Sequence, residues 1–139
     1  MSINTRAKKR EPVDALAEYA INDATEKTVK LNVPANIKST LLDISALGCS
    51  LDSQYLIPPG VILDIKIDPQ PFNEELGREK KIPLQFAGKV RSCVMRTGGH
   101  YRLGLRFINP EKENVELIDN FIASKERRKT PRWDITAQG

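Results

Sequence analysis

The alternation of apolar and polar residues along most of the chain predicts a series of short β-strands. Between Tyr101 and Phe107, for example, every second residue is aromatic or aliphatic, so these side chains share one face of an extended segment. Turn-forming sequences rich in Pro or Gly separate such segments at residues 58–60 and 97–100. The predicted strands cover residues 28–33, 37–45, 47–52, 61–68, 82–90 and 101–107.

Two other segments have helical spacing. Over residues 13–21 the apolar positions recur at intervals of three and four, and Ala, Leu and Glu favour a helix. We therefore expect a helix here, with a strand as the alternative because the odd positions are largely apolar. A second helix is expected to begin at Asn109 and Pro110, a capping residue followed by proline, and to run to about Arg127 before Pro131.

Together these elements predict a mainly β protein. Six short strands with a closing helix are typical of a small antiparallel barrel in which the helix plugs one side. A length of 139 residues suits one such domain with its own core. We expect a basic arm and helix over 1–27, the barrel with its closing helix over 28–128, and a basic tail over 129–139, with 68–81 as a long exposed loop.

Composition excludes several classes of protein. No apolar run is long enough to cross a bilayer and no apolar signal core is present, so we expect a cytoplasmic protein without membrane insertion. Cys49 and Cys93 lie in apolar runs and are expected as core thiols, and the single histidine, His100, as a turn residue. No nucleophile–base pair, phosphate loop or metal-ligand cluster is apparent, which predicts no catalytic residues, no metal and no cofactor.

The net charge of +4 is unevenly distributed. Basic residues gather at 6–10 and at 125–132, on either side of a nearly neutral middle. This pattern suggests an anionic partner, although basic ends can also serve only solubility.

One short motif stands out between two predicted strands. Asp43-Ile44-Ser45-Ala46-Leu47-Gly48 combines a carboxylate, a hydroxyl and a glycine in a turn, and an Arg-x-x-x-Arg pair, Arg6 and Arg10, lies upstream. With the strand from Gly99 to Phe107 and the helix that follows it, these motifs resemble the PilZ domain family. The resemblance implies a six-stranded barrel that binds cyclic di-GMP, a bacterial second messenger, and passes the signal to a protein effector.

The resemblance also implies roles for these residues. Arg6 and Arg10 would meet guanine or phosphate, since an arginine fork matches the paired acceptors of guanine. Asp43 would orient an arginine or accept from a guanine N–H, Ser45 would lend its hydroxyl to the ligand, and Gly48 would let the backbone approach it. Asp-x-Ser sequences are also common in ordinary turns, and glycine can serve a tight bend alone.

Alternatives exist for both the site and the function. A second Arg-x-x-x-Arg pair, Arg128 and Arg132, precedes Trp133, whose ring is able to stack on a base, and would form an alternative ligand arm. We rank Arg6 and Arg10 first. A small basic barrel also suits nucleic acid, but the sparse aromatic residues argue against it, and a degenerate PilZ domain would act only as a protein-interaction module.

Overall fold

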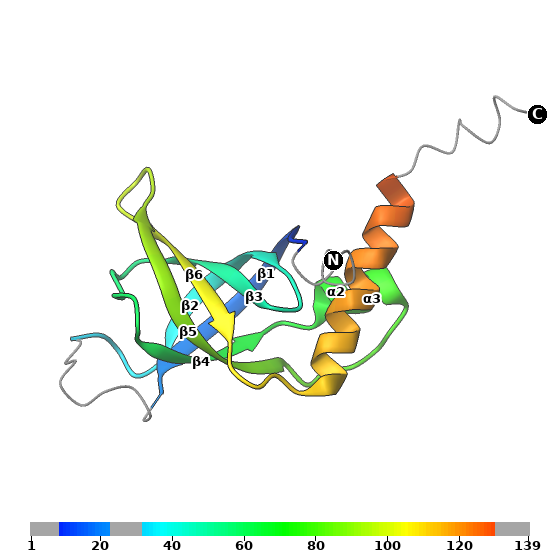
Figure 1. The fold of residues 1–139 in the computed structure, drawn as a ribbon, viewed down its shortest axis with the longest axis horizontal. Coiled ribbons are helices and arrows are strands. Elements are labelled where there is room, and N and C mark those ends of the chain that lie inside the picture. Colours follow the sequence, from blue (N-terminus) through cyan, green and yellow to red (C-terminus); the bar gives the residue numbers. More distant parts are fainter. Residues whose placement is uncertain (1–8, 23–31, 130–139) are drawn as a thin grey trace, which may run out of the picture.

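The protein forms a closed β-barrel with two helices at one end in the part of the chain that the structure describes (Figure 1). The structure is a computed structural model and describes residues 9–22 and 32–129. Its elements are β1 (Glu11–Ile21), β2 (Ile37–Ile44), β3 (Gly48–Ser53), β4 (Ile62–Ile67), α2 (Gln70–Leu76), β5 (Leu84–Met95), β6 (Tyr101–Phe107) and α3 (Lys112–Lys129).

The strands run around the barrel in the order β1-β2-β3-β6-β5-β4, and β1 closes it by pairing with β4. Every neighbouring pair is antiparallel. The predicted mainly β fold and its six-stranded antiparallel barrel are therefore confirmed.

The helix predicted over residues 13–21 is wrong, because these residues form β1. Ala15, Ala17 and Tyr19 alternate inward and are 4%, 9% and 1% exposed, whereas Leu16 points outward and is 71% exposed. A helix would have placed Leu16 on the same face as Ala17. Pairing with both β2 and β4 gives the strand two full ladders of backbone hydrogen bonds, and this tertiary pairing outweighs the local helix propensity.

The other predicted strands match the structure to different degrees. Residues 28–31 of the predicted first strand lie outside the described residues, and Asn32 and Val33 belong to no strand. The strands predicted over 37–45, 47–52, 61–68 and 101–107 are confirmed as β2, β3, β4 and β6. The strand predicted over 82–90 begins at Leu84 and continues to Met95, since a register shift between Val90 and Ser92 bends it without ending it.

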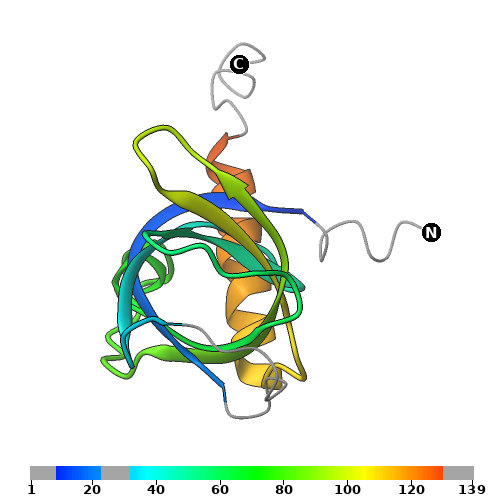
Figure 2. The same ribbon diagram turned by 90° about the vertical axis from the view of Figure 1, so that its left-hand side faces the viewer.

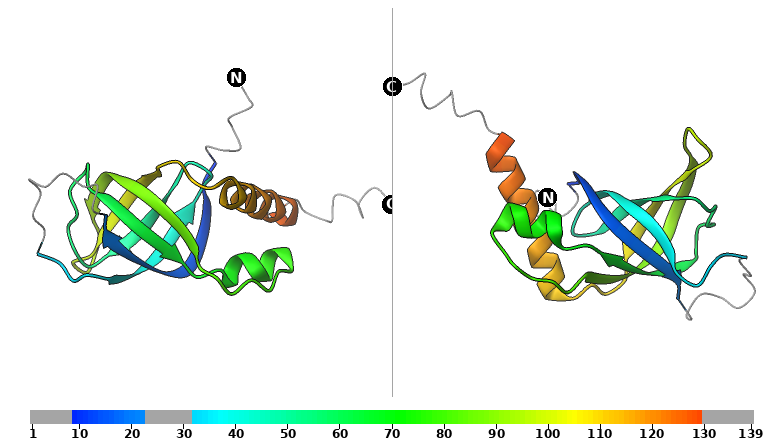
Figure 3. Two further views of the ribbon diagram at one scale, coloured as in Figure 1. Left: turned by 90° about the horizontal axis from the view of Figure 1, so that it is seen from below. Right: turned by 180° about the vertical axis from the view of Figure 1, so that it is seen from behind.

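Residues 68–81 are not a simple loop, because they contain α2. Prolines at its first turn and Gly77 at its end, with φ 65°, give this short helix a defined start and stop. Phe72 is fully buried and its ring lies 4.6 Å from that of Phe121 on α3. Figure 3 shows α2 and α3 beside each other at the same end of the barrel.

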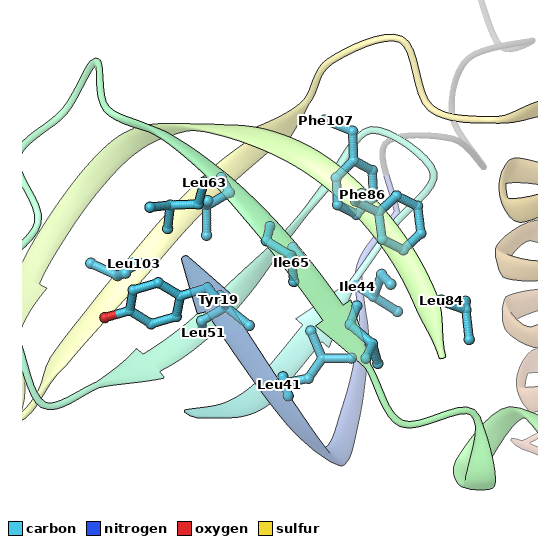
Figure 4. Packing of buried hydrophobic residues seen from close by; sticks show 14 of the residues in the cluster. Tyr19, Leu41, Ile44, Leu51, Leu63, Ile65, Leu84, Phe86, Leu103 and Phe107 are labelled. Carbon is cyan, nitrogen blue, oxygen red and sulfur yellow. The ribbon is translucent and has the colours of Figure 1, made fainter. Parts of the chain in front are cut away.

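Apolar side chains fill the barrel and continue to α3. Figure 4 shows Leu41, Leu51 and Leu103 at separate positions inside the ring of strands, and all three are fully buried. Phe86 stacks on Phe107 with ring centroids 4.1 Å apart. Viewed along the barrel, α3 crosses its far end (Figure 2). Ile118, Phe121 and Ile122 are the buried residues of that helix, so the predicted closing helix is confirmed.

The closing helix starts later than its sequence suggested. Asn109 has φ 44° and Pro110 precedes the first turn, so neither has the predicted capping role. The backbone N–H of Val115 donates to the carbonyl of Glu111 at 3.0 Å, which makes Glu111 the N-cap of a helix whose first residue is Lys112.

Candidate functional site

The candidate site is centred on the carboxylate of Asp43, near the end of β2. A register shift between Leu41 and Asp43 turns Asp43 outward while Ile44 points back into the core. The Asp43 side chain is nevertheless only 13% exposed, because arginine side chains cover it. One acidic group is thus held close beneath the surface, where it needs cationic partners.

Two arginines from different parts of the fold bind the two oxygens of this carboxylate. Nη1 of Arg10 donates to Oδ1 at 2.8 Å, and Nη2 of Arg102 donates to Oδ2. Arg10 directly precedes β1, whose Pro12 lies opposite Asp43, and Arg102 comes from the outward face of β6. We call Arg10, Asp43 and Arg102 the Asp43 clamp.

The clamp leaves hydrogen-bonding capacity at the surface. The side chains of Arg10 and Arg102 are 44% and 45% exposed, so each guanidinium is fixed on one side and open to solvent on another. A guanidinium has five N–H donors and a planar fork that fits guanine edges and phosphates. Two positive groups around one negative group also leave the clamp with a formal charge of +1.

The turn after β2 is closed by its own hydrogen bonds. The N–H of Ser45 donates to the Gly48 carbonyl at 2.8 Å, and the Ser45 hydroxyl accepts from the N–H of Leu47 at 3.2 Å. Ser45 is 2% exposed. Its hydroxyl therefore shapes the turn that carries Asp43 towards the surface.

The packing of β3 against β6 explains why position 48 is a glycine. A Cβ atom at this position would lie 2.0 Å from the carbonyl oxygen of Leu105 on the neighbouring strand β6. The close approach of two backbones excludes any side chain here. The glycine of the motif thus fixes how tightly β3 and β6 are joined beside Asp43.

The alternative ligand residues lie elsewhere. Arg128 is on α3 and donates to Glu75 of α2 at 2.9 Å, and Lys125 lies 3.6 Å from the same carboxylate. Arg132 and Trp133 lie outside the described residues, as does Arg6. Of the predicted ligand residues, the structure therefore brings together Arg10, Asp43, Ser45 and Gly48.

The carboxylate of Glu75 on α2 links this helix to α3 through one hydrogen bond and two cations. The Ser124 hydroxyl donates to the Glu75 carboxylate, and this bond, with the charges of Arg128 and Lys125, lowers the pKa of Glu75. The Glu75 side chain is only 4% exposed. Arg128 thus has a structural partner in the interface between α2 and α3.

The predicted turn residue His100 lies at the base of the hairpin between β5 and β6. Its Nδ1 is 3.0 Å from Oδ2 of Asp52, and Nη1 of Arg96 donates to Oδ1 of the same residue at 3.0 Å. The hairpin is thereby tied to β3. Across residues 9–22 and 32–129 no group of three or more His, Cys, Asp or Glu is able to hold a metal ion, and no helix there is long and apolar enough to cross a membrane.

Arg102 is the site residue that motif reasoning missed. Its position two residues before Gly104 on the outward face of β6 is visible in the alternation of that strand. The sequence does not show, however, that the arginine reaches across β3 to a residue 59 positions earlier. Only the order of strands in the barrel brings them together.

Comparisons with known proteins agree with this fold. The Bacillus subtilis inhibitor of motility, MotI/DgrA, is similar with a TM-score of 0.65 and 13% identity. The match covers 88% of this chain and 51% of that one. The PilZ domain of YcgR from Escherichia coli, solved with c-di-GMP, has a TM-score of 0.58 and 17% identity over 91% of this chain and 95% of its own.

A tetrameric PilZ domain from Xanthomonas campestris is similar with a TM-score of 0.59 and 13% identity, covering 94% of this chain and 99% of that one. No curated protein gives a significant sequence match. The family model for the PilZ domain matches residues 4–124, which include β1 and the whole Asp43 clamp. The chain therefore belongs to the PilZ domain family.

Proposed function

We propose that this chain is a non-catalytic receptor for cyclic di-GMP and that Arg10 contacts the ligand from the barrel surface. The observation that carries the proposal is the 2.8 Å hydrogen bond from Arg10 to Asp43, formed by an arginine side chain that is 44% exposed. The bond orients the guanidinium before any ligand arrives, which reduces the entropy lost on binding. Its open side is free to form a bidentate pair with guanine O6 and N7.

The chemistry of the ligand suits the surroundings of the clamp. Cyclic di-GMP carries two phosphate charges, and the basic residues of 6–10 lie next to the clamp in the sequence. Arg6, four residues before Arg10, is the second arginine of the proposed arm. Ser45 and Gly48 shape the turn that follows Asp43. The similar PilZ domain of E. coli YcgR was solved with c-di-GMP, which supports this choice of ligand.

The signal would reach a protein effector through the arm and α3. Nζ of Lys9 lies 2.7 Å from Oε2 of Glu126, so the residue next to Arg10 already contacts the closing helix. An arm that orders over a ligand would change this contact and present a new surface at the end of the barrel. From the family resemblance, we expect control of motility, polysaccharide synthesis or biofilm formation as the output.

Calorimetric titration of the purified chain tests the proposal. We expect cyclic di-GMP to bind at micromolar or lower concentration, with cyclic di-AMP and GTP as controls that bind at least about tenfold more weakly. The double variant R6A/R10A should lose about 100-fold or more in affinity, since two charge-assisted contacts are removed. The matched double variant R128A/R132A should bind within about threefold of the native chain.

Two results would overturn the proposal. A native chain that takes up no cyclic di-GMP at micromolar concentration is not a receptor for it. Loss of binding with R128A/R132A but not with R6A/R10A would move the ligand arm to the other end of the chain.

A further inference from the structure

The Asp43 carboxylate has a separate arginine partner for each of its two oxygens. Arg10 alone already balances its single negative charge. Arg102 nevertheless reaches across from β6 to bind the second oxygen of the same carboxylate. A single negative charge is thereby shared by two guanidiniums, and the surplus positive charge lies at the surface.

We infer that Arg102 is a ligand-contacting residue, a second arginine fork that meets the cyclic dinucleotide on the side of Asp43 opposite Arg10. This inference rests on the proposed function, because it names a further contact at the same site. One nitrogen of Arg102 is fixed by Asp43 while its side chain is 45% exposed. Like Arg10, it offers its remaining N–H donors in an orientation set in advance.

Small side chains lie between Asp43 and the strand that carries Arg102. Asp43 lies opposite Ser50 on β3, and Ser50 lies opposite Gly104, two residues after Arg102 on β6. Arg102 and Gly104 share the outward face of that strand. A planar base that contacts Arg102 on the Asp43 side would therefore lie beside backbone and hydroxyl groups.

The three residues of the clamp then have distinct tasks. Asp43 acts as a positioning residue for two arginines at once, and both arginines touch the ligand. Loss of Arg102 should then weaken binding even though Arg10, Asp43 and the turn remain. A lysine at position 102 would keep the positive charge but lose the planar fork.

Titration of R102A with cyclic di-GMP tests this directly, with R106A as the matched control. Arg106 has the same charge, lies on the same strand and face, and is exposed. We expect R102A to bind about tenfold or more weakly than the native chain, R106A to stay within about threefold, and R102K to remain at least about fivefold weaker. The slope of log affinity against log salt concentration should become shallower in R102A but not in R102K.

Thermal unfolding of each variant checks that the measured affinities belong to folded chains. If R102A unfolds, R102K still provides a cation for Asp43 and allows the test to be made. Native-like or tighter binding by R102A overturns the inference, because Arg102 would then only neutralise Asp43 or compete with the ligand. Equal losses in R102A and R106A also overturn it, since general surface charge would explain them. Full binding by R102K contradicts the need for a fork.

These outcomes separate the two proposals. If R6A/R10A abolishes binding while R102A does not, the receptor function stands and only the role of Arg102 fails. If the native chain takes up no cyclic di-GMP, both fail together.

Discussion

The substitution Gly48→Ala would test whether the glycine of the Asp43 turn is fixed by packing between strands. The added Cβ would lie 2.0 Å from the Leu105 carbonyl oxygen, 3.0 Å from its carbon and 3.1 Å from Cα of Arg106. All three are backbone atoms of β6, so no side-chain rotation relieves the overlap. The two strands must instead separate.

The size of the effect follows from the displacement. Restoring even a tight contact of about 3 Å requires β3 and β6 to move apart by about 1 Å, which stretches nearby backbone hydrogen bonds beyond their normal range. The bond from Phe107 N–H to the Leu47 carbonyl, now 2.9 Å, is directly affected. Loss of about two such bonds together with overpacking costs about 3–5 kcal/mol. For a chain of 139 residues this corresponds to a fall in Tm of about 10–15 °C.

Thermal and urea unfolding followed by circular dichroism provide the assay, with Gly104→Ala as the matched control. A Cβ at Gly104 would meet only the side chain of Ser92, with its hydroxyl oxygen at 2.5 Å and its Cβ at 3.8 Å, and the hydroxyl is able to rotate away. G104A should therefore cost less than about 1 kcal/mol. If G48A melts within about 2 °C of the native chain, or if G104A is equally destabilised, the packing explanation for Gly48 is wrong.

Two further predictions concern groups away from the ligand. Glu75→Gln should reduce the free energy of unfolding by about 1 kcal/mol at pH 7. Because the pKa of Glu75 in the folded chain lies below the ordinary 4.5, the stability difference between native chain and variant should persist above pH 4.5 and vanish as the pH falls through the lowered pKa. Unfolding curves from pH 7 to pH 3 would show or refute this dependence. Burial raises the pKa of Cys49 to about 12, so iodoacetamide at pH 8 should leave this thiol unmodified in the folded chain and modify it in denaturant. Peptide mass mapping that finds equal labelling in both states would contradict its burial.

The sequence was sufficient for the barrel but not for its first strand. Alternation located β2, β4 and β6 because each has one face in the core and one towards solvent. It also located β3, whose apolar and polar residues alternate although nearly all of them are buried. In β1 the inward residues include alanines and an outward residue is Leu16, so the two-residue period is weak and helix propensity competes with it. What decides the conformation is pairing with β2 and β4, which no local window contains.

The short helix α2 was missed for a related reason. Residues 68–81 are rich in charge and proline, which is typical of a loop, and Phe72 is their single aromatic residue. That ring finds a partner in Phe121, far along the chain. The prolines at the start and Gly77 at the end were the local signals that a helix begins and stops there.

The candidate site likewise contains residues that the sequence predicts and one that it does not. Asp43, Ser45 and Gly48 form a continuous motif, and their arrangement depends on local hydrogen bonds and a strand bulge. The arginine at position 102 joins them only because β3 lies between β2 and β6 in the closed sheet. A motif thus identifies one side of the clamp, and topology supplies the other.

Because β1 closes the barrel, a fragment that lacks this strand would have an open sheet. Ala17 pairs with Ser39 on one side and with Ile67 on the other, so this single strand covers two neighbours at once. A fragment starting at residue 28 would expose the unpaired N–H and C=O groups of both β2 and β4. Unpaired edge strands form backbone hydrogen bonds with other molecules, so the fragment should aggregate even though its own core residues are all present.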